Sequence, residues 1–208
     1  MNIIGTTHER VVFGRRVMRL SAVLAQVLPP DAVSILDVGC GDGQISRAIA
    51  DARPASSLQG IDVLVRPQTA IPVQVFDGSQ FPFYDESFDY VMMVDVLHHT
   101  DDPLAVLREA ARVARRGVLV KDHTASGVFA RPTLRLMDWV GNKRHGVELP
   151  YNYWTRQQWA DALDVLGLGQ RTRMTKLHLY SFPLSLLFDR SLHFVALFGK
   201  PTCSGVGA

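Results

Sequence analysis

The hydrophobic pattern of the chain alternates between short apolar runs and longer stretches with helical spacing. The short runs predict buried strands and cover residues 33–38, 58–63, 73–76, 90–94 and 117–120. The helical stretches lie before and between these strands and cover residues 12–27, 44–52 and 104–114. Strands that alternate with helices predict an α/β fold with a mainly parallel sheet.

The C-terminal part of the chain adds one helix and two strands. Thr155 is placed to begin the helix, Trp159 lies on its inward side, and Gly167 ends it. Residues 172–179 and 193–198 then read as two strands with no helix between them. This arrangement predicts an antiparallel hairpin at one edge of the sheet.

A glycine-rich turn joins the first strand to the helix that follows it. Gly39, Gly41 and Gly43 occupy alternate positions directly after residues 33–38. Glycines let the backbone turn tightly and approach a ligand, and a helix start offers unpaired N–H groups. The dinucleotide-binding pattern places its third glycine three residues after the second. The shorter spacing in this chain therefore argues against a dinucleotide.

Carboxylates around this turn indicate the charge of the ligand. Asp37 precedes the first glycine by two residues, and Asp42 lies inside the turn. These carboxylates would repel a pyrophosphate, but they suit S-adenosylmethionine, which carries a sulfonium and an ammonium group and no phosphate. Asp62 ends the second strand, where a carboxylate can accept both ribose hydroxyls of an adenosine. Asp77 follows the third strand, and its simplest role is in an Asp-Gly turn.

Two motifs carry a resemblance to a known family. Asp37-x-Gly39-x-Gly41-x-Gly43 resembles motif I of the class I SAM-dependent methyltransferases. Residues 81–89, Phe-Pro-Phe-Tyr-Asp-Glu-Ser-Phe-Asp, and the following residues 95–103 resemble the methyltransferase-11 type, a group that includes quinone-biosynthesis methyltransferases. The resemblance implies a single Rossmann-like α/β domain. Its sheet would be seven-stranded and mostly parallel, with an antiparallel last strand and helices on both faces.

The resemblance also implies S-adenosyl-L-methionine as the cofactor. In this family, an acidic residue at the position of Asp77 often contacts the adenine amino group. The residues expected to bind the cofactor follow the ends of the first four strands and are Asp37, Gly39, Cys40, Gly41, Gly43, Asp62, Val63, Asp77, Gly78 and Asp95.

Histidines near the ends of the fourth and fifth strands are the candidates for a general base. A neutral imidazole titrates near neutral pH and can take a proton from a phenol or another hydroxyl group. His123 follows the fifth strand and is the first candidate, and His98, after the fourth strand, is the second. His99 is expected to have a packing role. Methyl transfer itself depends mainly on positioning, so a base is needed only for an acceptor whose proton has a high pKa.

Asp95, Asp122 and His123 also raise the question of a metal site. Catechol-type methyltransferases hold magnesium with carboxylates at the ends of these two strands. Where they have an asparagine after the second aspartate, this chain has His123, which is a poor ligand for a hard cation. We therefore expect no metal.

The remaining segments suggest how the domain, residues 1–208, is completed. Residues 1–30 are expected to form a helical cover, with Arg10, Arg15, Arg16 and Arg19 on its solvated side. Residues 124–154 are rich in aromatic and basic side chains, and are expected to form a lid over the acceptor. This composition suggests an aromatic or hydrophobic acceptor and allows an acidic group on it.

Composition limits the remaining possibilities. A formal net charge of +2 gives no argument for a nucleic-acid partner, and two cysteines are compatible with a reducing, cytoplasmic location. We also expect no transmembrane segment.

The function expected is methyl transfer from S-adenosylmethionine to a small molecule. The alternatives are a non-catalytic SAM-binding module, a nicotinamide-dependent oxidoreductase, and an RNA or protein methyltransferase; no Asn-Pro-Pro-Tyr-type motif supports the last. The atom that is methylated and the oligomeric state do not follow from the sequence.

Overall fold

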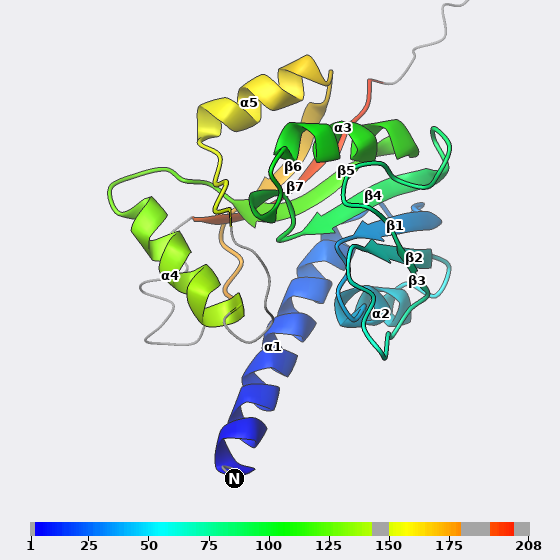
Figure 1. Cartoon of the computed structure of the whole chain (residues 1–208). Helices are drawn as coiled ribbons and strands as arrows, with labels where there is room; N and C mark the ends of the chain where they lie inside the picture. Colours follow the sequence, from blue (N-terminus) through cyan, green and yellow to red (C-terminus); the bar gives the residue numbers. More distant parts are fainter. Residues whose placement is uncertain (1–2, 143–149, 180–191, 202–208) are drawn as a thin grey trace, which may run out of the picture.

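A computed structural model describes residues 3–142, 150–179 and 192–201, except for the side chains of residues 3–13 and 138–142. The elements alternate along the chain much as the hydrophobic pattern predicts (Figure 1). In chain order they are α1 (Ile3–Val27), β1 (Ser34–Val38), α2 (Gln44–Ala52), β2 (Ser57–Asp62), β3 (Val73–Val75), β4 (Phe88–Val94), the 3-10 helix η1 (Leu97–His99), α3 (Pro103–Val113), β5 (Ala114–His123), α4 (Ala130–Asn142), α5 (Arg156–Val165), β6 (Gly169–Met174) and β7 (His193–Gly199).

The described strands form one seven-stranded sheet in the order β3-β2-β1-β4-β5-β7-β6. The pairs among β1 to β5 are parallel, whereas β7 runs antiparallel to both β5 and β6. The predicted fold class is therefore confirmed, including the antiparallel last strand. The strand predicted over residues 172–179 was misplaced: β6 starts at Gly169, because that residue already pairs with Gly199, and it ends at Met174.

Helices cover both faces of the sheet (Figure 1). On one face, α3 and α5 pack through residues such as Leu107 and Trp159. On the other face, α1 and α2 pack through Leu24 and Ile49. Neighbouring strand residues point to opposite faces, so the central strands are buried on both sides and read as continuous apolar runs.

Short-range signals set the starts of two helices. Asp102 accepts a hydrogen bond from the Ala105 N–H, and Pro103 takes the first helical position of α3, where its missing N–H costs nothing. Thr155 and Gln158 form a reciprocal capping box at the start of α5, as predicted for Thr155.

The helices α1 and α4 extend away from the sheet (Figure 1). The C-terminal half of α1 buries Leu20, Val23 and Leu24 against the sheet, and its N-terminal half projects away from it. The region 124–154 contains α4, and its residues 143–149 lie outside the described part of the chain. Among the helices described, none combines the length and the apolarity needed to cross a membrane.

Candidate active site

Four parallel strands end at the same edge of the sheet, and each is followed by candidate site residues. The glycine turn follows β1, Asp62 ends β2, Asp95 follows β4, and His123 ends β5. In open α/β sheets, ligands bind outside the carboxyl ends of the strands. This edge therefore contains the candidate site.

The glycine turn is tightly packed at two positions and open at one. Gly39, Gly41 and Gly43 all have positive φ angles, of 66°, 60° and 75°, a conformation that favours glycine. A Cβ atom added at Gly39 would lie 2.7 Å from Cγ2 of Val96, and one added at Gly43 would lie 2.6 Å from Cγ1 of Ile71. A Cβ added at Gly41 would meet no atom within 4 Å. The turn is thus held from behind while its middle glycine leaves space for a ligand.

Asp62 is tied to the glycine turn. Its Oδ2 accepts a hydrogen bond of 2.7 Å from the Gly41 N–H, and its Oδ1 accepts one of 2.9 Å from the Leu64 N–H. The carboxylate therefore lies beside the open glycine, at the position where the sequence predicts contact with the ribose.

Asp37 lies deeper than a direct ligand contact requires. Its side chain is buried, and its Oδ2 accepts a hydrogen bond of 2.6 Å from Ser46 Oγ in α2. Burial raises the pKa of Asp37 to about 7, partly opposed by the Ser46 hydrogen bond and assisted by the charge of Asp62. Near neutral pH, Asp37 can therefore exchange a proton.

The other predicted cofactor residues surround the same turns. Asp77 is exposed, and its Oδ1 accepts hydrogen bonds from the backbone N–H groups of Ser79 and Gln80, so it forms a polar turn with Gly78. Val63 is 60% exposed. The Sγ of Cys40 occupies the space that a side chain at Gly60 would need. The structure places Cys40, Val63, Asp77 and Gly78 at the carboxyl ends of β1, β2 and β3.

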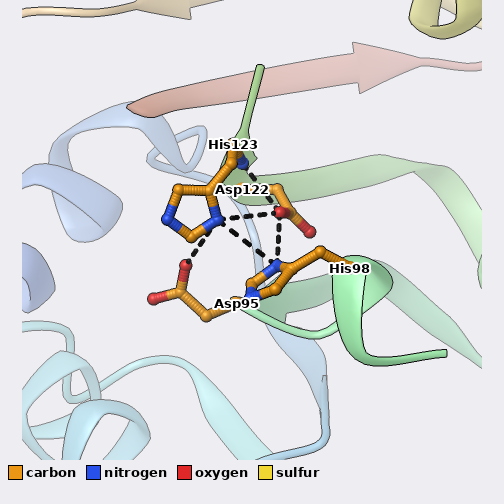
Figure 2. Close-up of side chains that lie close together, drawn as sticks. All are labelled: Asp95, His98, Asp122 and His123. Carbon is orange, nitrogen blue, oxygen red and sulfur yellow. Dashed lines mark hydrogen bonds and ion pairs between the residues drawn. The ribbon is translucent and has the colours of Figure 1, made fainter. Parts of the chain in front are cut away.

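A second group of polar side chains lies at the ends of β4 and β5 (Figure 2). Asp95, His98, Asp122 and His123 bring one nitrogen or oxygen atom each to within 4.8 Å of one another. Nδ1 of His98 lies 2.6 Å from Oδ1 of Asp122, and Nδ1 of His123 lies 3.3 Å from the same oxygen. The two Nδ1 atoms are 3.3 Å apart. The structure thus brings both predicted base candidates to one carboxylate.

Asp122 is held in place by backbone groups as well as by histidines. The Leu97 N–H donates to its Oδ2 over 3.1 Å, and the His123 N–H donates to its Oδ1 over 2.7 Å. Although burial alone would raise the pKa of Asp122, the neighbouring His98 and His123 lower it below its usual range. Asp122 therefore stays ionised and can orient an imidazole.

Lys121 is a polar residue of this site that the sequence analysis missed. Its side chain is fully buried and bonds Oδ1 of Asp95, and its Nζ lies 3.5 Å from Nδ1 of His193. Burial lowers the pKa of Lys121, and Asp95 opposes that effect. A lysine inside the buried strand, between Val120 and Asp122, was the signal that could have identified it.

Asp95 also receives a contact from the N-terminal helix. Nη2 of Arg16 lies 3.2 Å from Oδ2 of Asp95, so Arg16 is not simply part of a solvated face, as the sequence suggested. Burial would raise the pKa of Asp95, but Lys121, His123 and Arg16 outweigh it and lower that pKa well below its usual range. The φ angle of Asp95 is 58°, an unfavourable conformation for a non-glycine residue that is often found at functional sites.

The two histidines differ in their surroundings. Burial and the nearby Lys121 lower the pKa of His123, so its imidazole is neutral at neutral pH. His98 has its Nδ1 directed at the ionised Asp122, and an aspartate in that position favours a proton on Nδ1. Base chemistry on His98 would then use Nε2.

The same four side chains offer the atoms of a metal site, but their charges are already matched. Two imidazole nitrogens and two carboxylate oxygens form a donor set that suits a transition metal better than magnesium. Lys121 and Arg16 both bond Asp95, and a metal cation would have to compete with their positive charges. That no metal binds remains a prediction.

An aromatic wall adjoins this group. The ring of Tyr153 stacks on His98, with centroids 5.6 Å apart and an interplanar angle of 25°, and lies edge-on to His123 at 5.9 Å. The Asn152 N–H donates to the His98 carbonyl oxygen over 3.1 Å, and Asn152 Nδ2 donates to the Thr100 carbonyl oxygen over 2.7 Å. Part of the segment predicted to be a lid thus contacts the histidines directly.

Comparison with protein families identifies a domain over the centre of the chain. Residues 36–120 match the family description of a methyltransferase domain, Methyltransf_11. Among curated proteins, 132 residues are 33% identical to a demethylmenaquinone methyltransferase of Roseiflexus castenholzii, covering 58% of this chain and 54% of that protein. Another 113-residue match is 32% identical to a 27-O-demethylrifamycin SV methyltransferase of Amycolatopsis mediterranei, and it covers 48% of this chain and 41% of that protein. The chain thus spans about half or less of the length of these relatives.

Solved structures show the same fold at lower identity. An S-adenosylmethionine-dependent methyltransferase from Mesorhizobium loti superimposes with a TM-score of 0.65 at 19% identity, over 86% of this chain and 96% of that one. The [4+2]-cyclase SpnF gives a TM-score of 0.66 at 17% identity, over 88% and 80%. The second likeness illustrates that this fold alone does not fix the reaction.

The fold is that of the class I SAM-dependent methyltransferases. Residues 36–120 match the methyltransferase-11 family, so the resemblance predicted from the motifs is confirmed over that part of the chain. The cofactor of this class, S-adenosyl-L-methionine, was also predicted correctly.

Proposed function

We propose that the protein transfers the methyl group of S-adenosylmethionine to a small, aromatic or hydrophobic acceptor. One observation carries the proposal: the open glycine turn with Asp62 and the histidines around Asp122 lie at the same edge of one sheet. The first feature suits an adenosine with a cationic end, and the second suits proton removal from an acceptor. The quinone and rifamycin methyltransferases among the relatives act, by their names, on small molecules.

The cofactor residues are assigned by position. Asp62 would accept the ribose hydroxyls, with Gly41 leaving space for close approach. Asp77 and Gly78 would lie along the adenine, beside the exposed Val63. Asp37 and Asp95 would supply negative charge near the cationic end, with Gly39, Cys40 and Gly43 shaping the turn. When bound, the cofactor supplies an electrophilic methyl group.

His98 and His123 would act on the acceptor. Asp122 fixes the orientation of His98, which favours His98 as the base over our first sequence candidate. His123 has a lowered pKa and would serve mainly as a neutral hydrogen-bonding group beside it. Tyr153 and the rest of residues 124–154 would exclude water from the acceptor, the lid role expected from the sequence.

The cofactor assignment is tested by calorimetric titration with S-adenosylhomocysteine. We expect binding by the unmodified protein and its loss in Asp62→Ala, because that change removes both hydrogen-bond acceptors beside Gly41. Asp62→Asn separates the bond to the glycine turn from the bonds to the ribose, since its one remaining oxygen can still accept from the Gly41 N–H. Asp161→Ala, at an exposed position of α5, is the matched control. Absence of heat with the unmodified protein would exclude the proposal.

Turnover distinguishes methyl transfer from the alternatives. We expect release of S-adenosylhomocysteine when the protein and S-adenosylmethionine are incubated with a panel of phenols and hydroxyaromatic compounds. A non-catalytic module would bind the cofactor without releasing product in any mixture. An oxidoreductase would instead be stabilised by NAD in a thermal-shift comparison with S-adenosylmethionine.

A further inference from the structure

A pocket with a volume of about 300 Å³ lies beside α4. Its lining is aromatic and basic and consists of Arg131, Pro132, Arg135, Tyr151 and Tyr153. Arg131 and Arg135 are four positions apart on α4, so their side chains lie on the same side of the helix. A pocket of this size is at the lower end of the range for small-molecule sites.

The positive charge of this pocket is not balanced by its own lining. No carboxylate is among the lining residues, and the arginine ion pairs found within the described part of the chain do not include Arg131 or Arg135. The guanidinium group of Arg135 lies over the Tyr151 ring, 5.2 Å from its centroid. Like charges at this spacing repel each other, and a bound anion would remove that cost. Arginine pairs bind carboxylate and phosphate groups through parallel hydrogen bonds.

The aromatic wall of the pocket is fixed in position. Tyr153 is buried and packs with Ala130, Leu134 and Leu192. The φ angle of Tyr151 is 56°, a strained conformation that the hydrogen bonds of the neighbouring Asn152 to η1 and Thr100 help to hold. The two tyrosine rings, with centroids 6.1 Å apart, thus form a stable surface for an aromatic ligand.

This wall separates the pocket from the proposed base by one ring. Tyr153 lines the pocket and also stacks on His98, at 5.6 Å between centroids. The arginines and the proposed base therefore lie on opposite sides of one buried ring. The pocket and the histidines together fit an acceptor with an anion at one end and the reacting atom at the other.

We propose that this pocket binds an anionic group, a carboxylate or a phosphate, on an aromatic methyl acceptor. Arg131 and Arg135 bind the anion, and Tyr151 and Tyr153 contact the ring. The proposal rests on the methyltransferase function proposed above and names the class of acceptor that the same site selects.

The test compares three phenols that differ only in the group opposite the hydroxyl. Calorimetric titrations of 4-hydroxybenzoate, 4-hydroxyphenyl phosphate and the neutral 4-hydroxybenzamide are made with the full chain saturated with S-adenosylhomocysteine. We expect at least one anion to bind about tenfold more tightly than the amide, as two charge-assisted hydrogen bonds imply. The anion that gains more identifies the group recognised. The preference should weaken with added salt.

Variants assign the preference to the arginines. In the double variant Arg131→Gln/Arg135→Gln, we expect the anion and the amide to bind within about twofold of each other, because the charge is lost while the helix is kept. Arg108→Gln, at an exposed position of α3, should keep the full preference.

Equal affinity of the anions and the amide for the unmodified chain, or a preference that survives in the double variant, would overturn the inference. Binding of S-adenosylhomocysteine is measured separately in each variant. Its failure in the unmodified chain counts against the proposed function, whereas its success without anion preference counts against this inference alone.

Discussion

His98 and Asp122 are joined by a hydrogen bond of 2.6 Å although 24 residues separate them in the chain. Both side chains are almost fully buried, with exposed fractions of 2% and 3%. Asp122 also accepts from the Leu97 N–H, which fixes η1 against the end of β5. The orientation of His98 thus depends on a carboxylate that does not itself face an acceptor.

Replacement of Asp122 by asparagine tests this dependence. We expect Asp122→Asn to lower kcat by about 10- to 100-fold, within the range of general-base contributions, while the KM for S-adenosylmethionine changes little. An asparagine cannot stabilise the imidazolium, so the acidic limb of the pH–kcat profile should also move to lower pH. An unchanged profile would show that Asp122 has only a packing role, and Asp161→Asn provides the control.

Asp37 makes the stability of the protein depend on pH. Its pKa is about 7 in the folded state and about 3.8 in the unfolded state, so the folded state binds the extra proton between these values. The stability associated with this proton is fully present below pH 3.8 and is lost as the pH rises through about 7. Asp37→Asn keeps a hydrogen-bonding side chain beside Ser46 but cannot ionise.

We therefore expect Asp37→Asn to raise the free energy of unfolding relative to the unmodified protein at pH 8 and to have little effect at pH 4. The difference at pH 8 has an upper limit of roughly 4 kcal/mol, from the size of the shift. Urea unfolding without cofactor at both pH values measures it, and Asp51→Asn, on the exposed side of α2, is the control. A difference that does not change with pH would contradict the prediction.

The buried ion pair of Lys121 and Asp95 should contribute to stability only as a pair. Lys121→Met leaves Asp95 with Arg16 as its cationic partner and is expected to reduce the free energy of unfolding by about 3 kcal/mol, as for other broken buried pairs. The double variant Lys121→Met/Asp95→Asn removes both charges and should recover much of this loss. A double-mutant cycle from denaturant unfolding gives the coupling free energy. Additive effects of the two changes would argue against coupling.

The same ion pairs lead us to expect that no metal is required. Exhaustive chelation should leave turnover unchanged, and equilibrium dialysis should show less than about one magnesium or zinc ion per chain, since cations already bond Asp95. Loss of activity on chelation, with recovery on adding one metal, would reverse this expectation. Asp95→Asn should then weaken binding of that metal.

The sequence was sufficient for the framework because local signals specify it. The apolar runs and Thr155 identified most strands and one helix start, and the two motifs identified the class of cofactor. One difference, the early start of β6, depends on pairing with β7, a contact between distant residues. Local patterns do not contain that information.

The candidate site was predicted in part for the same reason. The ends of neighbouring strands converge in any parallel sheet, so Asp122 and the two histidines could be placed near one another. The partners of Asp95 could not, because Arg16 lies 79 residues away and a buried lysine looks like a surface residue in a sequence. The contact of Tyr153 with His98 likewise depends on how residues 150–154 return to the sheet edge.

Val96 occupies the space that only a glycine at position 39 leaves open. It follows Asp95 directly and precedes η1, which carries His98. The cofactor turn after β1 therefore lies directly against the segment that leads from β4 to the acceptor side. A side chain added at Gly39 would displace Val96. A smaller residue at position 96 would relieve the clash but not the strain of a side chain at a φ of 66°, so position 39 is restricted to glycine by its neighbour and by its own backbone.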